Sequence, residues 1–139
     1  MKKIKIACDS EIIFKAIPGY ENYLISNTGI ILSSVSGKIM SSFTNRAGYK
    51  RIELTSVDGR RKKYMVHRLV LSVFPDINGN MLELESDYNN CSVDHLDKNR
   101  TNNSSDNLEI VTQIENLNRR YKVIIWRIMN MKKRLTKIM

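Results

Sequence analysis

The sequence predicts an α+β fold, with a small N-terminal antiparallel β-sheet module, a strand–loop–strand–helix unit and a basic C-terminal helix. Three patterns lead to this prediction. Apolar and polar residues alternate between turn signals through the first half of the chain, as in strands with one buried face. Residues 66–74 then change to helical spacing. Residues 92–118 hold two short strand-like runs around a polar loop, followed by a helix-start signal.

Composition indicates a folded chain with an anionic partner. The 139 residues are 42% hydrophobic, which is enough for the core of one domain. The formal net charge is +9 and no acidic residue follows Glu115, so nucleic acid is the favoured partner. The alternative is a lysine-rich protein that its charge merely keeps soluble.

Several classes of protein are excluded. Cys8 and Cys91 lie far apart and form no CxxC pair, so neither a disulfide framework nor a structural zinc site is expected. The first residues lack the apolar run of a secretory signal, and no stretch is long enough to span a bilayer. We therefore expect an intracellular, cytoplasmic protein that is not secreted and does not enter a membrane.

The first half is predicted to form strands. A hairpin is expected first, with strands over residues 23–26 and 30–33 and a turn at Asn27-Thr28-Gly29, where glycine tolerates positive φ. Three further strands, separated by glycine-containing turns, are expected over residues 38–43, 49–56 and 63–66. We expect all of these strands to make one small antiparallel sheet.

A short helix is predicted over residues 66–74. Its apolar residues recur at helical spacing and a proline follows them: Leu69, Val70, Val73, Phe74 and Pro75. His67 stands at the start of this helix beside a core face. We interpret it as a structural hydrogen-bonding residue rather than a ligand.

Residues 92–118 are predicted to form strand, loop, strand and helix. The strands cover residues 92–96 and 108–112, on either side of a loop of turn-forming residues. Thr112 and Glu115 fit a capping box, in which both side chains satisfy free N–H groups, so a helix is expected to begin at Gln113. The predicted units are residues 1–66, 67–120 and 121–139.

This layout gathers three polar side chains. Asp94 and His95 end the first strand, on opposite faces unless the strand ends or twists there. Asn116, in the first helical turn, leans back toward Asp94. A carboxylate and a carboxamide oxygen form a sparse, hard ligand set that Mg²⁺ accepts, with Mn²⁺ or another divalent cation as the alternative. A neutral histidine beside such an ion can take a proton from water during phosphodiester hydrolysis.

The stretch VDHLDKNRTNNSSDNLEIVTQIENLN (residues 93–118) resembles the HNH motif of phage and intron homing endonucleases, whose fold is the ββα-metal finger. The resemblance implies that His95 is the general base and that Asp94 and Asn116 bind the metal. It further implies that Asn107 braces the loop and holds His95. No small-molecule cofactor is implied.

The upstream stretches IPGYENYLISNTG, GYKRIEL and VHRLVLSVF resemble the N-terminal module that is often fused to these endonucleases. Phe14 stands where that module usually has tryptophan, and we interpret it as a replacement within the core. Near the motif, six basic residues are predicted to contact the phosphates of double-stranded DNA: Arg68, Lys98, Arg100, Arg119, Arg120 and Lys122.

Residues 121–139 mix basic and apolar residues. They are predicted to form a helix that packs an apolar stripe on the body, with Trp126 as a core anchor. The basic side chains of this helix would point outward and lie along the DNA phosphates. A helix on a membrane surface is the alternative.

These patterns together predict a metal-dependent HNH DNA endonuclease of the homing type, which nicks or cuts duplex DNA by hydrolysis. One predicted centre attacks one strand at a time, so a monomer is favoured over a dimer. Two alternatives stay open. One is a catalytically inactive nucleic-acid-binding module of the same fold, and the other is a small basic protein that binds RNA or a membrane.

Overall fold

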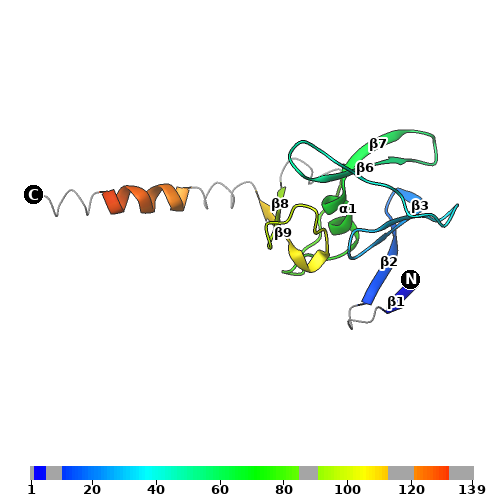
Figure 1. The fold of residues 1–139 in the computed structure, drawn as a ribbon, viewed down its shortest axis with the longest axis horizontal. Coiled ribbons are helices and arrows are strands. Elements are labelled where there is room, and N and C mark those ends of the chain that lie inside the picture. Colours follow the sequence, from blue (N-terminus) through cyan, green and yellow to red (C-terminus); the bar gives the residue numbers. More distant parts are fainter. Residues whose placement is uncertain (1, 6–10, 85–90, 113–120, 132–139) are drawn as a thin grey trace, which may run out of the picture.

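A computed structural model describes residues 2–5, 11–84, 91–112 and 121–131 of the chain. Within these ranges two antiparallel sheets, a central helix and a two-stranded hairpin form one body, and a second helix follows (Figure 1). The α+β fold class predicted from the sequence is confirmed, with small antiparallel sheets and two helices.

The first sheet has four antiparallel strands in chain order: β1 (Lys2–Lys5), β2 (Glu11–Ile17), β3 (Tyr20–Ser26) and β4 (Ile31–Ser33). The pairing of Ile25 with Ile31 confirms the hairpin that the turn at residues 27–29 predicted. Phe14 on β2 is buried, as expected for a core replacement. Strand β1 was not predicted from the sequence.

The second sheet has three antiparallel strands: β5 (Phe43–Thr44), β6 (Lys50–Thr55) and β7 (Arg61–Met65). Strands β6 and β7 match the predictions for residues 49–56 and 63–66. The predicted strand over residues 38–43 is wrong, because only an isolated bridge between Leu32 and Ile39 precedes β5. Ile39 and Phe43 are 70% and 45% exposed, so the face that carries them is not buried, and only Met40 of this segment packs against the core. The expected single sheet is therefore two sheets.

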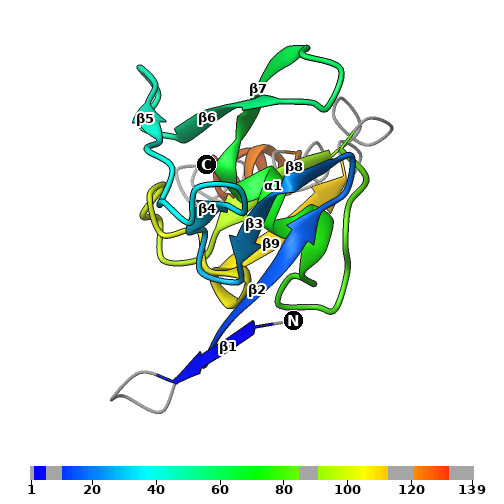
Figure 2. The same cartoon turned by 90° about the vertical axis from the view of Figure 1, so that its right-hand side faces the viewer.

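Helix α1 (Val66–Val73) confirms the predicted short helix, which ends before Pro75. It contacts β2 and β3 of the first sheet, β6 and β7 of the second, and the turn before β9 (Figure 2). Six of its eight residues are buried because it is enclosed by these elements. One core contains residues of every part of the body: Ile17, Ile25, Ile52, Leu54, Leu69, Val70, Val93 and Leu108.

Strands β8 (Cys91–His95) and β9 (Leu108–Thr112) pair antiparallel, and a 3₁₀ turn η1 (Ser105–Asn107) leads into β9. The predicted second strand has these bounds, and the first is shifted by one residue. The start of the helix expected at Gln113 lies outside the described residues, which resume at residue 121.

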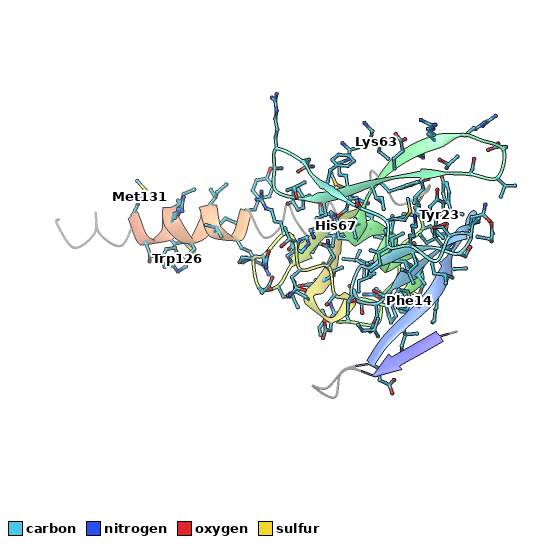
Figure 3. All side chains as sticks on the ribbon, turned by 45° about the vertical axis from the view of Figure 1, so that its right-hand side comes forward. Phe14, Tyr23, Lys63, His67, Trp126 and Met131 are labelled. Carbon is cyan, nitrogen blue, oxygen red and sulfur yellow. The ribbon has the colours of Figure 1, made fainter. Side chains whose placement is uncertain are left out.

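Residues 121–131 form a helix. The expectation that Trp126 anchors it in a core is wrong, because this side chain is 65% exposed and stands clear of the body (Figure 3). The other apolar side chains of the helix are exposed too, so its apolar stripe packs on nothing that the structure describes. Within the described ranges, neither helix has the length and apolar character needed to cross a bilayer.

Candidate active site

The β8–β9 ladder sets the directions of the two central side chains. Asp94 pairs with Glu109 and is exposed, whereas His95 pairs with Leu108 and is buried. This is the alternation that the sequence predicted. Because β8 ends at His95, both residues still reach one hollow of about 260 Å³. Its wall is formed by Tyr49, Val93, Asp94, His95, Lys98 and Arg100.

Three side chains fix the imidazole of His95, which is 6% exposed. Its Nε2 lies 2.9 Å from Oδ1 of Asn103, a hydrogen-bond distance. The ring of His67 meets it edge-on at 5.3 Å between centroids, and the ring of Tyr49 lies 5.9 Å away. A ring held on three sides has little freedom to rotate, and its accessible part faces the hollow.

The loop after β8 is closed by the side chains of Asp97 and Asn107. Asn107 donates from Nδ2 to Asp97 Oδ1 (3.0 Å) and to the Asn102 carbonyl (2.9 Å), and its Oδ1 accepts from the Asp97 N–H (3.1 Å). Asn102 donates to the other Asp97 oxygen at 2.9 Å. The Asn107 side chain thus supplies hydrogen-bond partners to backbone N–H and C=O groups of an irregular loop.

Asp97 is the acceptor at the centre of this loop. Hydrogen bonds from the Asn102 side chain, the Asn99 N–H and the Asn107 side chain lower the pKa of its carboxyl group. The carboxylate therefore stays ionised. Its role is to hold the loop, which the sequence did not assign.

The basic residues that were predicted to contact DNA differ in their backbone conformation and in the groups they contact. Lys98 has φ +64°, the only positive φ at a residue other than glycine in the ranges that the structure describes. Arg100 donates to the Ala47 carbonyl and stacks its guanidinium 4.9 Å from the centroid of the Tyr49 ring. Arg68 donates to the Cys91 carbonyl at 2.6 Å and thereby ties α1 to β8, outside the wall of the hollow.

His67 is a buried, neutral neighbour of the site and lies inside the body, where α1 begins (Figure 3). Burial is the main cause that lowers its pKa from the usual 6.5 to about 3, and electrostatic repulsion from His95 and Arg68 adds to it. Its buried Nδ1 has no hydrogen-bond partner among the described residues. The hydrogen-bonding role expected for His67 is therefore absent at Nδ1, and its ring acts by packing on His95.

Not every predicted site residue can be placed. Asn116, Arg119 and Arg120 lie outside the described residues, and Lys122 is an exposed residue of the second helix. The sequence missed Asn103 and Tyr49. Nothing in an asparagine-rich loop distinguishes the one asparagine that faces the histidine. Tyr49 was treated only as a strand residue, 46 positions before its ring partner.

A divalent cation fits this site only as a sparsely held ion. Among the described residues, no group of three or more His, Cys, Asp and Glu side chains could surround a metal. Asp94 is nevertheless an exposed carboxylate on the wall of the hollow. One or two protein oxygens suffice for Mg²⁺, which keeps several waters and takes others from phosphate. The donor chemistry of Asp94 is consistent with such an ion.

Larger hollows lie elsewhere on the described residues. Those of about 650 and 530 Å³ lie beside Tyr20 and Ser56, and one of about 350 Å³ lies at Trp126. None of these three is lined by a histidine, and Asp58 in the first is bonded to Ser56 and Arg60. The smaller hollow holds the predicted site residues Asp94 and His95, so its lining, and not its size, makes it the candidate active site.

Two segments of this chain match models of known protein families. The NUMOD4 motif matches residues 13–55, and the HNH endonuclease model matches residues 85–118. The H-N-H endonuclease F-TflII of Escherichia phage T5 is 37% identical over 100 residues, which cover 72% of this chain and 48% of that protein. DNA endonuclease I-HmuI of Bacillus phage SP01 is 41% identical over 101 residues, which cover 72% and 52%.

The chain thus spans about half the length of these curated relatives. A solved structure agrees with the sequence matches. It is described as "DNA binding and cleavage by the HNH homing endonuclease I-HmuI" and is 35% identical, with a TM-score of 0.63. The alignment covers 87% of this chain and 68% of that one.

Proposed function

Because this chain belongs to the HNH endonuclease family, we propose that it is a metal-dependent endonuclease that hydrolyses phosphodiester bonds of double-stranded DNA. One observation carries the proposal. A single hollow brings together the carboxylate of Asp94, the imidazole of His95 and the basic side chains of Lys98 and Arg100. These are the groups needed to hold a phosphate, neutralise it and activate water beside it.

His95 is proposed as the general base. It takes a proton from a water molecule, and the electron pair of that O–H bond forms the new P–O bond. The bond from phosphorus to the 3′ oxygen breaks, and its electron pair leaves with that oxygen, which gains a proton from solvent. The products carry 5′-phosphate and 3′-hydroxyl ends. The shallow exposure of His95 suits this role, because its accessible edge opens on the hollow rather than on bulk water.

Asp94 is proposed to hold a divalent cation, together with Asn116 from beyond the described residues. When bound, Mg²⁺ or Mn²⁺ supplies positive charge to the phosphate and to the leaving oxygen. Asp94 offers this ion an oxygen on the open face of β8, while His95 stays on the buried face. The ladder thus separates the ion-binding group from the proton-accepting group by one residue.

Lys98 and Arg100 are proposed to contact the phosphate backbone of DNA. A left-handed lysine costs about 1–2 kcal/mol, and strain of this kind is concentrated at functional sites. Arg100 is oriented in advance by Ala47 and Tyr49. Further exposed basic side chains lie on the β6–β7 hairpin and add to the positive surface: Arg60, Arg61, Lys62 and Lys63. The proposal for Arg119, Arg120 and Lys122 rests on their charge alone.

Cleavage of a supercoiled plasmid tests the proposed base. We expect His95→Ala to lower the cleavage rate at least about 100-fold, since general base catalysis contributes roughly 10² to 10⁴. DNA binding should persist in a filter-binding assay without divalent ion. Cleavage by His95→Ala at the rate of the parent would overturn the assignment. DNA binding without cleavage by the parent would indicate an inactive binding module.

The proposed ion site has its own test. Asp94→Ala and Asn116→Ala are expected to raise the Mg²⁺ concentration needed for half-maximal cleavage, and a chelator should abolish the parent's activity. Asp106→Ala is the matched control, because this exposed aspartate of η1 does not line the hollow. Equal Mg²⁺ requirements for Asp94→Ala and Asp106→Ala would contradict the assignment.

A further inference from the structure

We infer that Asn103 is a positioning residue, whose amide oxygen keeps the proton of neutral His95 on Nε2 and leaves Nδ1 to accept the proton of the attacking water. This inference rests on the proposed function of His95. It adds which ring nitrogen reacts and which residue selects it.

The hydrogen bond between the two side chains carries the inference. His95 Nε2 lies 2.9 Å from Asn103 Oδ1, and these side chains are 6% and 4% exposed. An amide oxygen can only accept a hydrogen bond. A neutral imidazole has one protonated and one bare nitrogen, so Nε2 must carry the proton and Nδ1 the lone pair. The opposite tautomer would place two acceptors against each other in a buried site, at a cost of about 1–3 kcal/mol.

The first sheet holds Asn103 in this position. A Cβ added to Gly29, in the turn between β3 and β4, would lie 3.1 Å from Cβ of Asn103 and 3.7 Å from its carbonyl oxygen. Two residues further along the loop, the Ser105 N–H donates to the Asn27 carbonyl at 2.8 Å. The turn therefore supports the loop closely enough that a side chain at residue 29 would have to displace Asn103 by a few tenths of an ångström.

Aromatic contacts prevent the imidazole from turning over. A half-turn of the ring would present Nε2 to the hollow and leave Nδ1 facing the amide. The rings of His67 and Tyr49 lie 5.3 and 5.9 Å from that of His95 and 5.5 Å from each other, which makes a three-ring cluster. With Nε2 tied to Asn103, the nitrogen available for reaction is Nδ1.

The same hydrogen bond serves both stages of proton transfer. Before reaction, Nε2–H donates to the amide oxygen and the lone pair of Nδ1 is free of the proton. After Nδ1 takes the proton from water, the ring is a cation, and Nε2–H still donates to Asn103. No rearrangement of the ring accompanies the step, which is the condition for an oriented base.

The test is ¹⁵N NMR of the histidine side chains in the full chain, which has two histidines. His95→Ala removes one set of signals and so assigns both. We expect His95 in the parent to be protonated at Nε2 and bare at Nδ1. In Asn103→Leu, similar in size but without an acceptor, the Nδ1-protonated form should appear. The single-turnover cleavage rate should fall about 10- to 100-fold with DNA affinity unchanged.

Asn103→Asp supplies the rescue, because a carboxylate oxygen also accepts from Nε2. It is expected to keep the parent's tautomer and to recover most of the lost rate. Asn102→Leu is the matched control: it removes a loop hydrogen bond to Asp97 and none to the ring, so His95 should keep its Nε2 proton.

The failures of the two proposals are distinguishable. A parent His95 protonated at Nδ1, or an Asn103→Leu variant with the parent's tautomer and rate, would overturn the role of Asn103 and leave the endonuclease proposal standing. Undiminished cleavage by His95→Ala would overturn the proposed base itself. The parent spectrum decides the tautomer even if Asn103→Leu does not fold.

Discussion

At the scale of single residues, the site depends on a histidine that is not proposed to react. His67 packs edge-on against His95 and at a tilt against Tyr49, and it is buried at the point where both sheets meet α1. Its pKa of about 3 keeps it uncharged at neutral pH. A second cation beside His95 would repel the proton that this proposed base must accept. A neutral ring avoids this repulsion and still packs.

The buried neutral state of His67 predicts acid sensitivity of the fold. The unfolded chain takes up the proton near pH 6.5 and the folded chain only near pH 3, so the unfolded state binds more protons between these values. Stability is therefore highest above pH 6.5 and falls as the pH drops through the window. The loss is about 1.4 kcal/mol per pH unit, or ~2 kcal/mol between pH 6.5 and 5.

Denaturant unfolding of the parent and of His67→Phe, at about pH 7.5 and about pH 5, measures this loss. Phenylalanine keeps a packed ring without a titrating nitrogen. We expect the variant to lose ~2 kcal/mol less than the parent on acidification. Equal losses would mean that His67 is already protonated in the fold or is not buried.

At the scale of elements, the hairpin turn between β3 and β4 supports the candidate active site although it contributes no residue proposed to react. Gly29 adopts φ +92° and lies against Asn103, and Asn27 accepts the N–H of Ser105. The family segments at residues 13–55 and 85–118 meet here. We therefore expect a change in the first segment to alter catalysis in the second.

Gly29→Ala and Gly19→Ala form a matched pair that separates this effect from backbone strain. Both glycines have positive φ, +92° and +79°, in turns of the same sheet. Both variants should lose about 1 kcal/mol of stability from the left-handed backbone. Only at Gly29 would the new Cβ press on Asn103, since nothing lies within 4 Å of a Cβ at Gly19.

We expect Gly29→Ala to lower the single-turnover cleavage rate about tenfold, and Gly19→Ala to cut DNA like the parent. Assays run well below the unfolding temperature of both variants remove the contribution of unfolded protein. Equal rates in the two variants would show that the turn does not reach the site.

The sequence predicted the elements whose signals are local. Turn chemistry at residues 27–29 and helical spacing at residues 66–74 depend on neighbours in the chain, and the structure has both elements. The strand expected over residues 38–43 was wrong because the segment pairs only through the bridge from Ile39 to Leu32, and the side chain of Ile39 is exposed. β1 was missed because it forms only by pairing with β2, which composition does not encode.

The candidate site likewise has residues that the sequence could predict and residues that it could not. Asp94 and His95 could be found because the motif is contiguous and its spacing is specific. The ring neighbours of His95 could not be found, since Tyr49 lies just before β6 and His67 lies on α1. Nor could Gly29 of the first sheet, which lies against Asn103. These contacts arise only when the sheets pack around α1, so no pattern within the motif contains them.

At the scale of the whole molecule, the two family segments share one hydrophobic core. Ile17 and Ile25 of the first sheet belong to the same buried cluster as Leu69 of α1 and Val93 and Leu108 of the β8–β9 hairpin. A small core shared in this way favours all-or-none unfolding. Residues 66 and 67, where the division into units was predicted, lie between the two matched segments, and Val66 belongs to this common core.

Leu108→Ala tests this cooperativity. Leu108 is fully buried, so removing its methyl groups should cost about 2–5 kcal/mol. If the core is one unit, the slowest-exchanging amides of β2 and β3 must lose the same free energy of protection as those of β8 and β9. Leu96→Ala is the control, because this leucine of the same hairpin is 44% exposed and should cost under about 0.5 kcal/mol. Native-state hydrogen exchange measures each amide separately. Loss of protection confined to β8 and β9 would mean that the first sheet folds independently of the β8–β9 hairpin. The turn at Gly29 could then not hold Asn103 when that hairpin opens.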